Sequence, residues 1–232
     1  EAFGQGHVHA TRGNLNNHIG LPMTLLGLRP RHRVAVVEIG MNHPKEIQEL
    51  ARAAAPTAVV ITNAQREHQE FMQTVEACAR ENGAALDFIE PKGFAALPCD
   101  IDHEPIWASR LQARTDIQLI RFGLQGQPAS TTAWTQRPLG RPNLELRASV
   151  GPGPSLAVSL VIERHEEATS FLAVETETLG TVRLPAIGEH YASNFAAAAG
   201  LALAMGAAPK SLQRGLARFT PVNGRGKGHQ IQ

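Results

Sequence analysis

The chain has 232 residues, of which 43% are hydrophobic and 19% charged, so it is long enough for one large domain and has the composition of an ordinary globular protein. Its net charge of +1 provides no strong field for nucleic acid or anionic lipid, and no apolar run approaches the roughly 20 residues that a membrane span needs. The two cysteines, Cys78 and Cys99, argue against a disulfide scaffold and fit reduced thiols in a cytoplasm.

Strand and helix patterns alternate along the first half of the chain. Short runs rich in β-branched residues predict buried strands, and apolar residues at helical spacing predict the helices between them. This order predicts right-handed crossovers and an α/β fold with a largely parallel sheet flanked by helices. The predicted strands cover 33–38, 57–62, 94–97 and 117–122, and the predicted helices cover 22–28, 44–55, 70–89 and 105–113.

The pattern changes near Gly123, where Gly, Pro, Thr and Ser become frequent. Short alternating runs separated by turn signals predict antiparallel hairpins in a subregion over 123–185, as a small sheet packed on the main one. Helices are expected again at 191–205 and 209–218. The predicted strands of the subregion cover 143–150, 155–163, 169–175 and 181–184, with a turn at Leu179-Gly180 between the last two.

The ends of the chain suggest a piece of a longer protein. The first residue is not Met, and the last residues follow a Gly-rich run at 224–228, so we expect both ends to be cuts. The phosphate-binding pattern G-x-x-x-x-G-K-[ST] does not occur anywhere in the sequence.

Polar residues follow two of the predicted parallel strands. Glu38 closes the first, Asn63 closes the second, and His68 lies in the loop beyond it. Ligands bind beyond the carboxyl ends of such strands, and a carboxylate with an imidazole could ligate one divalent metal such as Mg²⁺. The alternative is a buried strand-end glutamate and an unrelated surface histidine.

A polar loop precedes the first strong strand. Its sequence, TRGNLNNHIGLP, contains Thr11, Asn14, Asn16 and Asn17 and two glycines, so it could offer amide and backbone N–H donors to phosphate or sugar. The alternative is a plain surface loop that caps the following helix.

Other polar and aromatic residues favour structural roles. Cys78 lies on a predicted helix without a histidine partner nearby and is interpreted as packing, and Trp107 and Trp134 are isolated. The run Glu163–Glu167 is most simply a solvated turn.

Taken together, five segments resemble the Mur ligase family, in family order and over nearly the whole chain. The loop and the strand end with its Glu-Ile-Gly-Met-Asn-His-Pro run are most similar to the MurF-type ligases. The segments are TRGNLNNHIGLPMTLLGL (11–28), VAVVEIGMNHPKEIQEL (34–50), APTAVVITNAQREHQEF (55–71), LPAIGEHYASNFAAAAGLAL (184–203) and PVNGR (221–225).

The resemblance implies an ATP-dependent, cytoplasmic and monomeric amide ligase that adds D-Ala-D-Ala to UDP-MurNAc-tripeptide in peptidoglycan synthesis, without nucleic acid or membrane insertion. It implies that Glu38 and His68 are catalytic and bind Mg²⁺. It also implies nucleotide contacts and a loop that faces the muramoyl substrate. The implied nucleotide contacts are His190, Asn194 and Arg225, and the implied substrate contacts are Thr11, Asn14, Asn16 and Asn17.

The chain departs from the family pattern at the second metal site. Family members usually carry a carbamylated lysine where this chain has Asn82, and an amide side chain cannot form a carbamate. Water could fill this place, a carboxylate such as Glu67 or Glu81 could help, or the second site could be weak. Lys45 stands where Gly is common, and Tyr191 stands where Asn is common.

The resemblance further implies that 1–232 is a central ATP-binding domain without its P-loop, with the N-terminal UDP-binding and C-terminal domains absent. The chain alone is therefore expected to be inactive. Two alternatives remain: a sibling Mur or folylpolyglutamate-type ligase, and a non-catalytic module that binds other proteins of wall synthesis.

Overall fold

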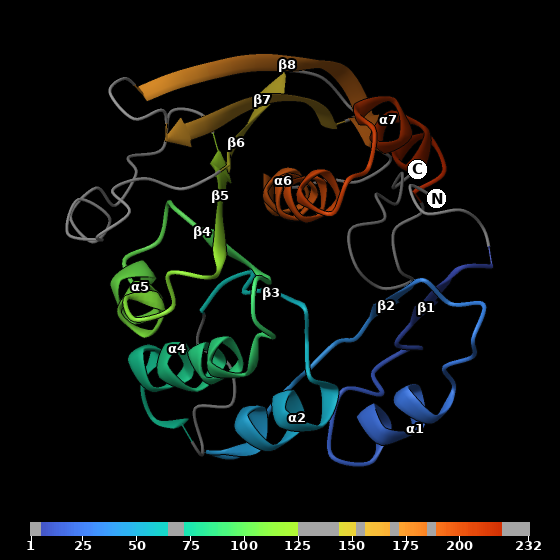
Figure 1. Cartoon of the computed structure of the whole chain (residues 1–232), viewed down its shortest axis with the longest axis vertical. Helices are drawn as coiled ribbons and strands as arrows, with labels where there is room; N and C mark the ends of the chain where they lie inside the picture. The colour runs from blue at the N-terminus through green and yellow to red at the C-terminus, as the bar shows by residue number, and fades with distance from the viewer. Residues whose placement is uncertain are drawn as a thin grey trace, which may run out of the picture.

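The computed structural model describes residues 6–64, 72–124, 144–151, 156–167, 172–184 and 189–219. Its strands form a two-stranded sheet of β1 and β2 and a six-stranded sheet in which β3 to β8 follow in chain order (Figure 1). The strands are β1 (Val8–Ala10), β2 (Val34–Val36), β3 (Ala58–Val60), β4 (Phe94–Pro98), β5 (Gln118–Leu124), β6 (Leu144–Gly151), β7 (Leu156–Glu167) and β8 (Leu172–Leu184). The helices are α1 (Gly20–Leu26), α2 (Glu46–Ala54), α4 (Val75–Gly83), the 3₁₀ helix η1 (Ala84–Phe88), α5 (Glu104–Leu111), α6 (Glu189–Ala204) and α7 (Pro209–Ala217).

The six-stranded sheet is parallel from β3 to β6 and antiparallel from β6 to β8. Residues 119–123 of β5 are all buried, as expected of a central parallel strand covered on both faces. Along β6 buried and half-buried residues alternate from Leu144 to Ser149, so this strand presents one face to the core. The predicted fold class is therefore confirmed.

Helices cover both faces of the large sheet. Figure 1 shows α5 and α6 on opposite sides of β5. One hydrophobic cluster lies with α2, α4, η1 and α5 and includes Leu97, Trp107 and Leu119. A second cluster lies with α6 and includes Ile120 and Leu146. Neighbouring residues of β5 thus enter two different cores because side chains alternate along a strand.

The antiparallel strands join the main sheet, whereas the sequence predicted a small sheet packed on it. The connection is the parallel pairing of β5 with β6, from Ile120 opposite Leu144 to Leu124 opposite Ala148. The strands β6 to β8 lie within 123–185. Alternation along a strand predicts which side chains share a face but not which edge the strand joins.

Two predicted turns are wrong. Leu179-Gly180 lies inside the continuous strand β8, and an irregularity opposite Val158 and Leu160 absorbs the shift in register. The run Glu163–Glu167 forms the end of β7, where it pairs with β8 from Thr176 to Leu172. Partner strands supply the hydrogen bonds that these polar segments would otherwise find in solvent.

Within the described residues, the helix predicted over 70–89 is interrupted after Met72. Gln73 has a left-handed φ of 60°, and the Thr74 hydroxyl accepts from the Ala77 N–H over 3.1 Å, so α4 begins at Val75. Its last turn tightens into η1. In the described residues, no helix has the length and apolar character that crossing a membrane requires.

Candidate functional site

Polar residues lie beyond the ends of β2 and β3, but these strands belong to different sheets, whereas the sequence pattern predicted neighbouring strands of one parallel sheet. Glu38 follows β2 by two residues and is exposed, and Asn63 follows β3 by three residues and is half-buried. The carboxyl ends of parallel strands are where open α/β sheets bind ligands.

Thr11 and Asn16 hold Glu38 from two sides. The Glu38 N–H donates to Thr11 Oγ1 over 2.9 Å, and Asn16 Nδ2 donates to Glu38 Oε1 over 2.8 Å. Thr11 extends the pairing of β1 with β2, because its N–H donates to the Val36 carbonyl over 3.0 Å. Three of the predicted site residues are therefore brought together.

The loop between β1 and α1 is shaped by its own turns. The Leu15 N–H donates to the Arg12 carbonyl over 3.3 Å, and Gly13 adopts a φ of +59°, which favours glycine. At the start of α1 the chain passes so closely that a Cβ on Gly20 would lie 2.4 Å from Leu15 Cα. This close approach fixes the loop against the helix.

The three loop asparagines are used differently. Asn17 Oδ1 accepts from the N–H groups of Ile19 and Gly20 over 3.1 and 2.9 Å, so it starts α1. Asn16 contacts Glu38, and Asn14 is exposed with no side-chain hydrogen bond to the described part of the chain. The interpretation of the loop as a helix cap therefore applies to Asn17, whereas Asn14 and Asn16 remain candidates for a role in the site.

Glu46, the first residue of α2, forms hydrogen bonds with the backbone of the segment that follows Glu38. Glu46 Oε2 accepts from the N–H groups of Asn42 and His43 over 2.6 and 3.2 Å. The hydrogen bond from Asn42 is the main cause that lowers the pKa of Glu46, and the bond from His43 adds to it. Lys45, which directly precedes Glu46, has a φ of 75°, a left-handed conformation that glycine adopts most easily.

The predicted nucleotide contacts are only partly described. His190 and Asn194 lie exposed on the first turns of α6, with the His190 ring 4.5 Å from the ring of Tyr191 between centroids. No hydrogen bond between described residues joins them to Glu38. His68 and Arg225 lie outside the described residues.

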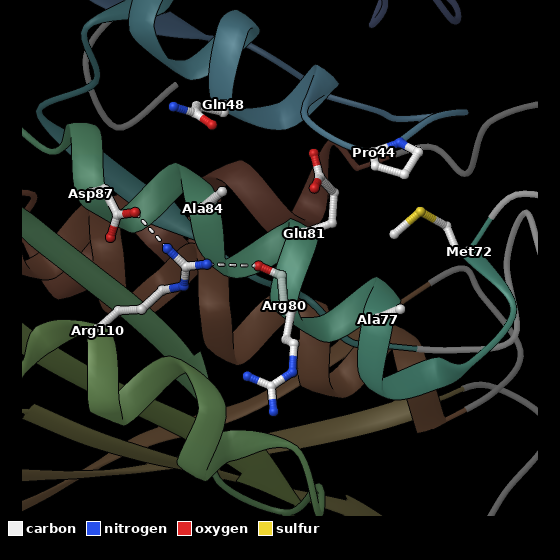
Figure 2. Close-up of a pocket in the computed structure, with 9 residues that line it drawn as sticks. All are labelled: Pro44, Gln48, Met72, Ala77, Arg80, Glu81, Ala84, Asp87 and Arg110. Atoms are coloured by element: carbon white, nitrogen blue, oxygen red, sulfur yellow. Dashed lines mark hydrogen bonds and ion pairs between the residues drawn. The ribbon is translucent and has the colours of Figure 1, made fainter.

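Asn82 and Glu81 face different parts of the molecule. Asn82 Nδ2 donates to the Asn63 carbonyl over 3.4 Å, so Asn82 reaches the segment that follows β3. Glu81 Oε1 accepts from the Ile47 N–H over 3.1 Å and thereby caps α2. Figure 2 shows the Glu81 carboxylate directed toward the helix that contains Gln48.

A pocket of about 350 Å³ lies between α2, α4, η1 and α5 (Figure 2). Arg110 forms an ion pair with Asp87 and donates to the Arg80 carbonyl over 3.2 Å. This pocket was not predicted from the sequence, because its residues come from separate segments without a shared motif. The lining residues are Pro44, Gln48, Met72, Ala77, Arg80, Glu81, Ala84, Asp87 and Arg110.

The chemistry of Glu38 fits a divalent cation. Its carboxylate is exposed, one oxygen accepts from Asn16, and Oε2 accepts no hydrogen bond from the described residues. Mg²⁺ prefers such oxygen ligands and keeps several waters. Within the described residues, no three His, Cys, Asp or Glu side chains converge as a metal site, and His68 is not among those residues.

Comparison with known proteins adds a family match. A family model described as the Mur ligase middle domain matches residues 1–202. The chain is 28% identical over 220 residues to a UDP-N-acetylmuramoyl-tripeptide–D-alanyl-D-alanine ligase from Escherichia coli (strain K12), covering 95% of this chain and 42% of that protein. It therefore spans about two fifths of the length of this relative.

Two solved structures share the fold. MurF from Acinetobacter baumannii matches with a TM-score of 0.70 and 28% identity, over 94% of this chain and 41% of that one. A MurF ligase from Thermotoga maritima in complex with ADP matches with a TM-score of 0.65 and 19% identity, over 95% of this chain and 44% of that one. At this lower identity the second match concerns the fold alone.

Proposed function

Because this chain belongs to the Mur ligase middle domain family, we propose that it is the ATP-binding part of an enzyme that joins D-Ala-D-Ala to UDP-MurNAc-tripeptide. The observation that carries the proposal is the exposed Glu38 carboxylate, held at a strand end by Thr11 and Asn16 within the matched residues. The relative from Escherichia coli is named for the same reaction, and the Thermotoga maritima structure contains ADP.

The proposed reaction makes an amide bond in two steps. The terminal carboxylate of the tripeptide takes the γ-phosphoryl group of ATP, which releases ADP and forms an acyl phosphate. The amine of D-Ala-D-Ala attacks the acyl carbon, and the tetrahedral intermediate expels phosphate as the amine loses a proton. A carboxylate is a poor electrophile, so the first step supplies the activation that the second requires.

The residues have separate proposed tasks. Glu38 and His68 would hold Mg²⁺, which when bound neutralises charge on the phosphates. Asn194, Arg225 and His190 would contact the nucleotide. The loop with Thr11, Asn14, Asn16 and Asn17 would face the muramoyl substrate, and it would orient the reactants for attack.

The metal arrangement proposed here has one charged partner fewer than the family pattern. Asn82 is neutral and its amide contacts the Asn63 carbonyl. Glu81 is already used by the N–H of Ile47. We therefore favour water, rather than Glu81, at the place of the carbamate.

Phosphate release by the complete parent enzyme tests the proposal. Release should require both UDP-MurNAc-tripeptide and D-Ala-D-Ala, and Glu38→Gln should lower kcat by about 100-fold or more, because a direct ligand of the charge-stabilising metal is lost. Glu49→Gln, an exposed carboxylate on α2, is the matched control and should leave the rate close to that of wild type. Phosphate release that requires a different amino acid in place of D-Ala-D-Ala would indicate a sibling ligase. No phosphate release with any amino acid or dipeptide would contradict the proposal that the parent protein is an enzyme.

We also propose that the parent enzyme is a cytoplasmic monomer that neither inserts into membranes nor binds nucleic acid. The buried cysteines Cys78 and Cys99 are not joined in a disulfide, which fits a reducing compartment. Residues 1–232 alone, which contain no G-x-x-x-x-G-K-[ST] sequence, should give no turnover. Light scattering on the parent enzyme and a turnover assay on residues 1–232 measure these two points.

A further inference from the structure

Asn16 is tied to the segment after β2 through both its backbone and its side chain. Its N–H donates to the Asn14 carbonyl over 2.8 Å, and its carbonyl accepts from the Gly40 N–H over 2.9 Å. The amide Nδ2 then reaches Glu38 Oε1 at 2.8 Å. Asn16 is half-buried, so its amide has little freedom to turn toward a ligand in solvent.

Gly40 shapes the place in which this amide lies. A Cβ on Gly40 would lie 2.7 Å from Asn16 Nδ2 and 3.0 Å from Asn16 Cγ. Any side chain at Gly40 would therefore push the Asn16 amide away from Glu38. Gly40, which has no side chain, therefore leaves the room in which the Asn16 amide contacts Glu38.

The contact has a defined chemical effect on Glu38. A carboxylate only accepts hydrogen bonds, so the amide must present its NH₂ group. This neutral donor occupies Oε1 and restricts the rotation of an otherwise exposed side chain, without adding a positive charge that would repel a cation. Partners that orient a metal ligand in this way typically contribute 10–100-fold to metal affinity.

We infer that Asn16 is a positioning residue that orients Glu38 for the divalent cation, and that Asn14 is the asparagine of this loop that faces substrate. This inference rests on the proposed function, because it takes Glu38 as a metal ligand. It assigns one role to each loop asparagine, since Asn17 is committed to α1. Asn14 is exposed, and no described residue binds its side chain.

Mn²⁺ binding to the complete parent enzyme, measured by EPR with a methylene-bridged ATP analogue present, tests the inference. Asn16→Ala should raise the Kd for Mn²⁺ about tenfold, because the Glu38 carboxylate loses its orientation. Alanine keeps both backbone hydrogen bonds of residue 16, so the loop should stay folded, and the Tm checks this. Gly40→Ala should weaken Mn²⁺ binding similarly, although it removes no hydrogen-bonding group.

Asn14→Ala is the matched control in the same loop. It should leave the Kd for Mn²⁺ unchanged and raise the KM for UDP-MurNAc-tripeptide, whereas Asn16→Ala should raise the Mg²⁺ concentration needed for half-maximal rate. In a Glu38→Gln background, Asn16→Ala should cause no further loss of Mn²⁺ affinity, because the two changes act on one contact.

The outcomes separate two failures. If Glu38→Gln binds Mn²⁺ as tightly as wild type, the proposed metal role of Glu38 is wrong and the positioning role is overturned with it. If Glu38→Gln weakens binding but Asn16→Ala and Gly40→Ala do not, only the positioning role is overturned. A raised KM for the muramoyl substrate in Asn16→Ala, with normal Mn²⁺ affinity, would identify Asn16 as a substrate contact.

Discussion

Glu104 and Arg121 form a buried ion pair between α5 and β5. Their side chains are 0% and 6% exposed, and the guanidinium donates to both carboxylate oxygens over 2.9 and 3.0 Å. Arg121 also lies 3.7 Å from Glu145, which in turn pairs with Arg147 at 2.8 Å. Such a pair contributes little net stability when intact, but removing one member leaves a buried charge.

Glu104→Gln should lower the free energy of unfolding by about 3 kcal/mol, because the buried Arg121 would lose the closer of its two carboxylate partners and keep only the 3.7 Å contact with Glu145. Urea unfolding measures the change. Glu76→Gln is the control, since Glu76 and Arg80 are more than half exposed, and it should cost under about 0.5 kcal/mol. Equal effects of the two substitutions would show that burial does not determine the cost.

Cys99 is a fully buried thiol whose Sγ donates to the Phe122 carbonyl over 3.0 Å. Burial raises the pKa of the Cys99 thiol to about 12, from a usual value of 9.0. Folding therefore favours the neutral thiol. Its contribution to stability is present below about pH 9 and is lost as the pH rises toward about 12.

Between pH 9 and 12, the unfolding free energy of wild type should fall more steeply than that of Cys99→Ser, because serine does not ionise in this range. Unfolding by urea at several pH values measures the difference, and other groups titrate equally in both proteins. A thiol reagent at pH 8 should not modify native Cys99. Rapid modification would contradict the buried neutral thiol.

At the scale of elements, α6 contacts the large sheet through small residues. Ala192, Ala196, Ala199 and Gly200 are buried along the helix. A Cβ on Gly200 would lie 2.7 Å from Ile120 Cγ2 and 2.8 Å from Leu146 Cδ1. The glycine therefore sets how closely the helix and the sheet approach.

Gly200→Ala should destabilise the protein by about 1–3 kcal/mol, because the added methyl overpacks the interface with β5 and β6. Gly215→Ala makes the same change in α7, where a Cβ would meet nothing within 4 Å, and should stabilise by about 0.5–1 kcal/mol through helix propensity. Thermal unfolding compares the two. A gain at both positions would contradict the close contact of α6.

The elements differ in how well their sequence predicts them. The strands β4 and β5 and the helices α2, α5, α6 and α7 lie close to their predicted ranges, because apolar spacing and proline mark them locally. The continuous β8 and the late start of α4 were not predictable in this way. The first depends on pairing with β7, and the second on a left-handed residue at Gln73.

At the scale of the whole molecule, two hydrophobic cores share the same strands. Leu97 and Leu119 belong to the core with α4 and α5, whereas Ala96 and Ile120 belong to the core with α6. Both cores use side chains of β4 and β5, one from each face of these strands. Unfolding of either core would therefore remove the strands on which the other core packs. We expect both cores to unfold together.

Ile120→Ala should lower the unfolding free energy by about 3 kcal/mol and shift the unfolding midpoint of Trp107 fluorescence by the same amount as that of far-UV circular dichroism. Trp107 reports the opposite core, and a Trp134→Phe background removes the other indole. Leu119→Ala, beside Ile120 but on the Trp107 side, is the matched comparison. Separate midpoints for the two signals would contradict one cooperative unit.

The position of Glu38 could be predicted from the sequence, because polar residues of α/β sites lie just beyond the ends of strands. A carboxylate after a β-branched run is visible in the sequence, and Glu38 lies where that pattern predicts. The partition of the loop asparagines was not visible, because Asn14, Asn16 and Asn17 are alike in type and nearly adjacent. Only the folded loop separates an exposed amide from one that contacts Glu38 and one that starts α1.

Asn82, whose amide contacts the Asn63 carbonyl, has a consequence for the small molecules that the proposed ligase needs. A lysine carbamate forms from the amine and dissolved carbon dioxide, so enzymes that use one depend on bicarbonate in their medium. An asparagine needs no such addition and is complete as soon as it is translated. The parent enzyme should therefore work equally well in degassed, bicarbonate-free buffer, and replacing Asn82 by lysine should introduce a dependence on carbon dioxide.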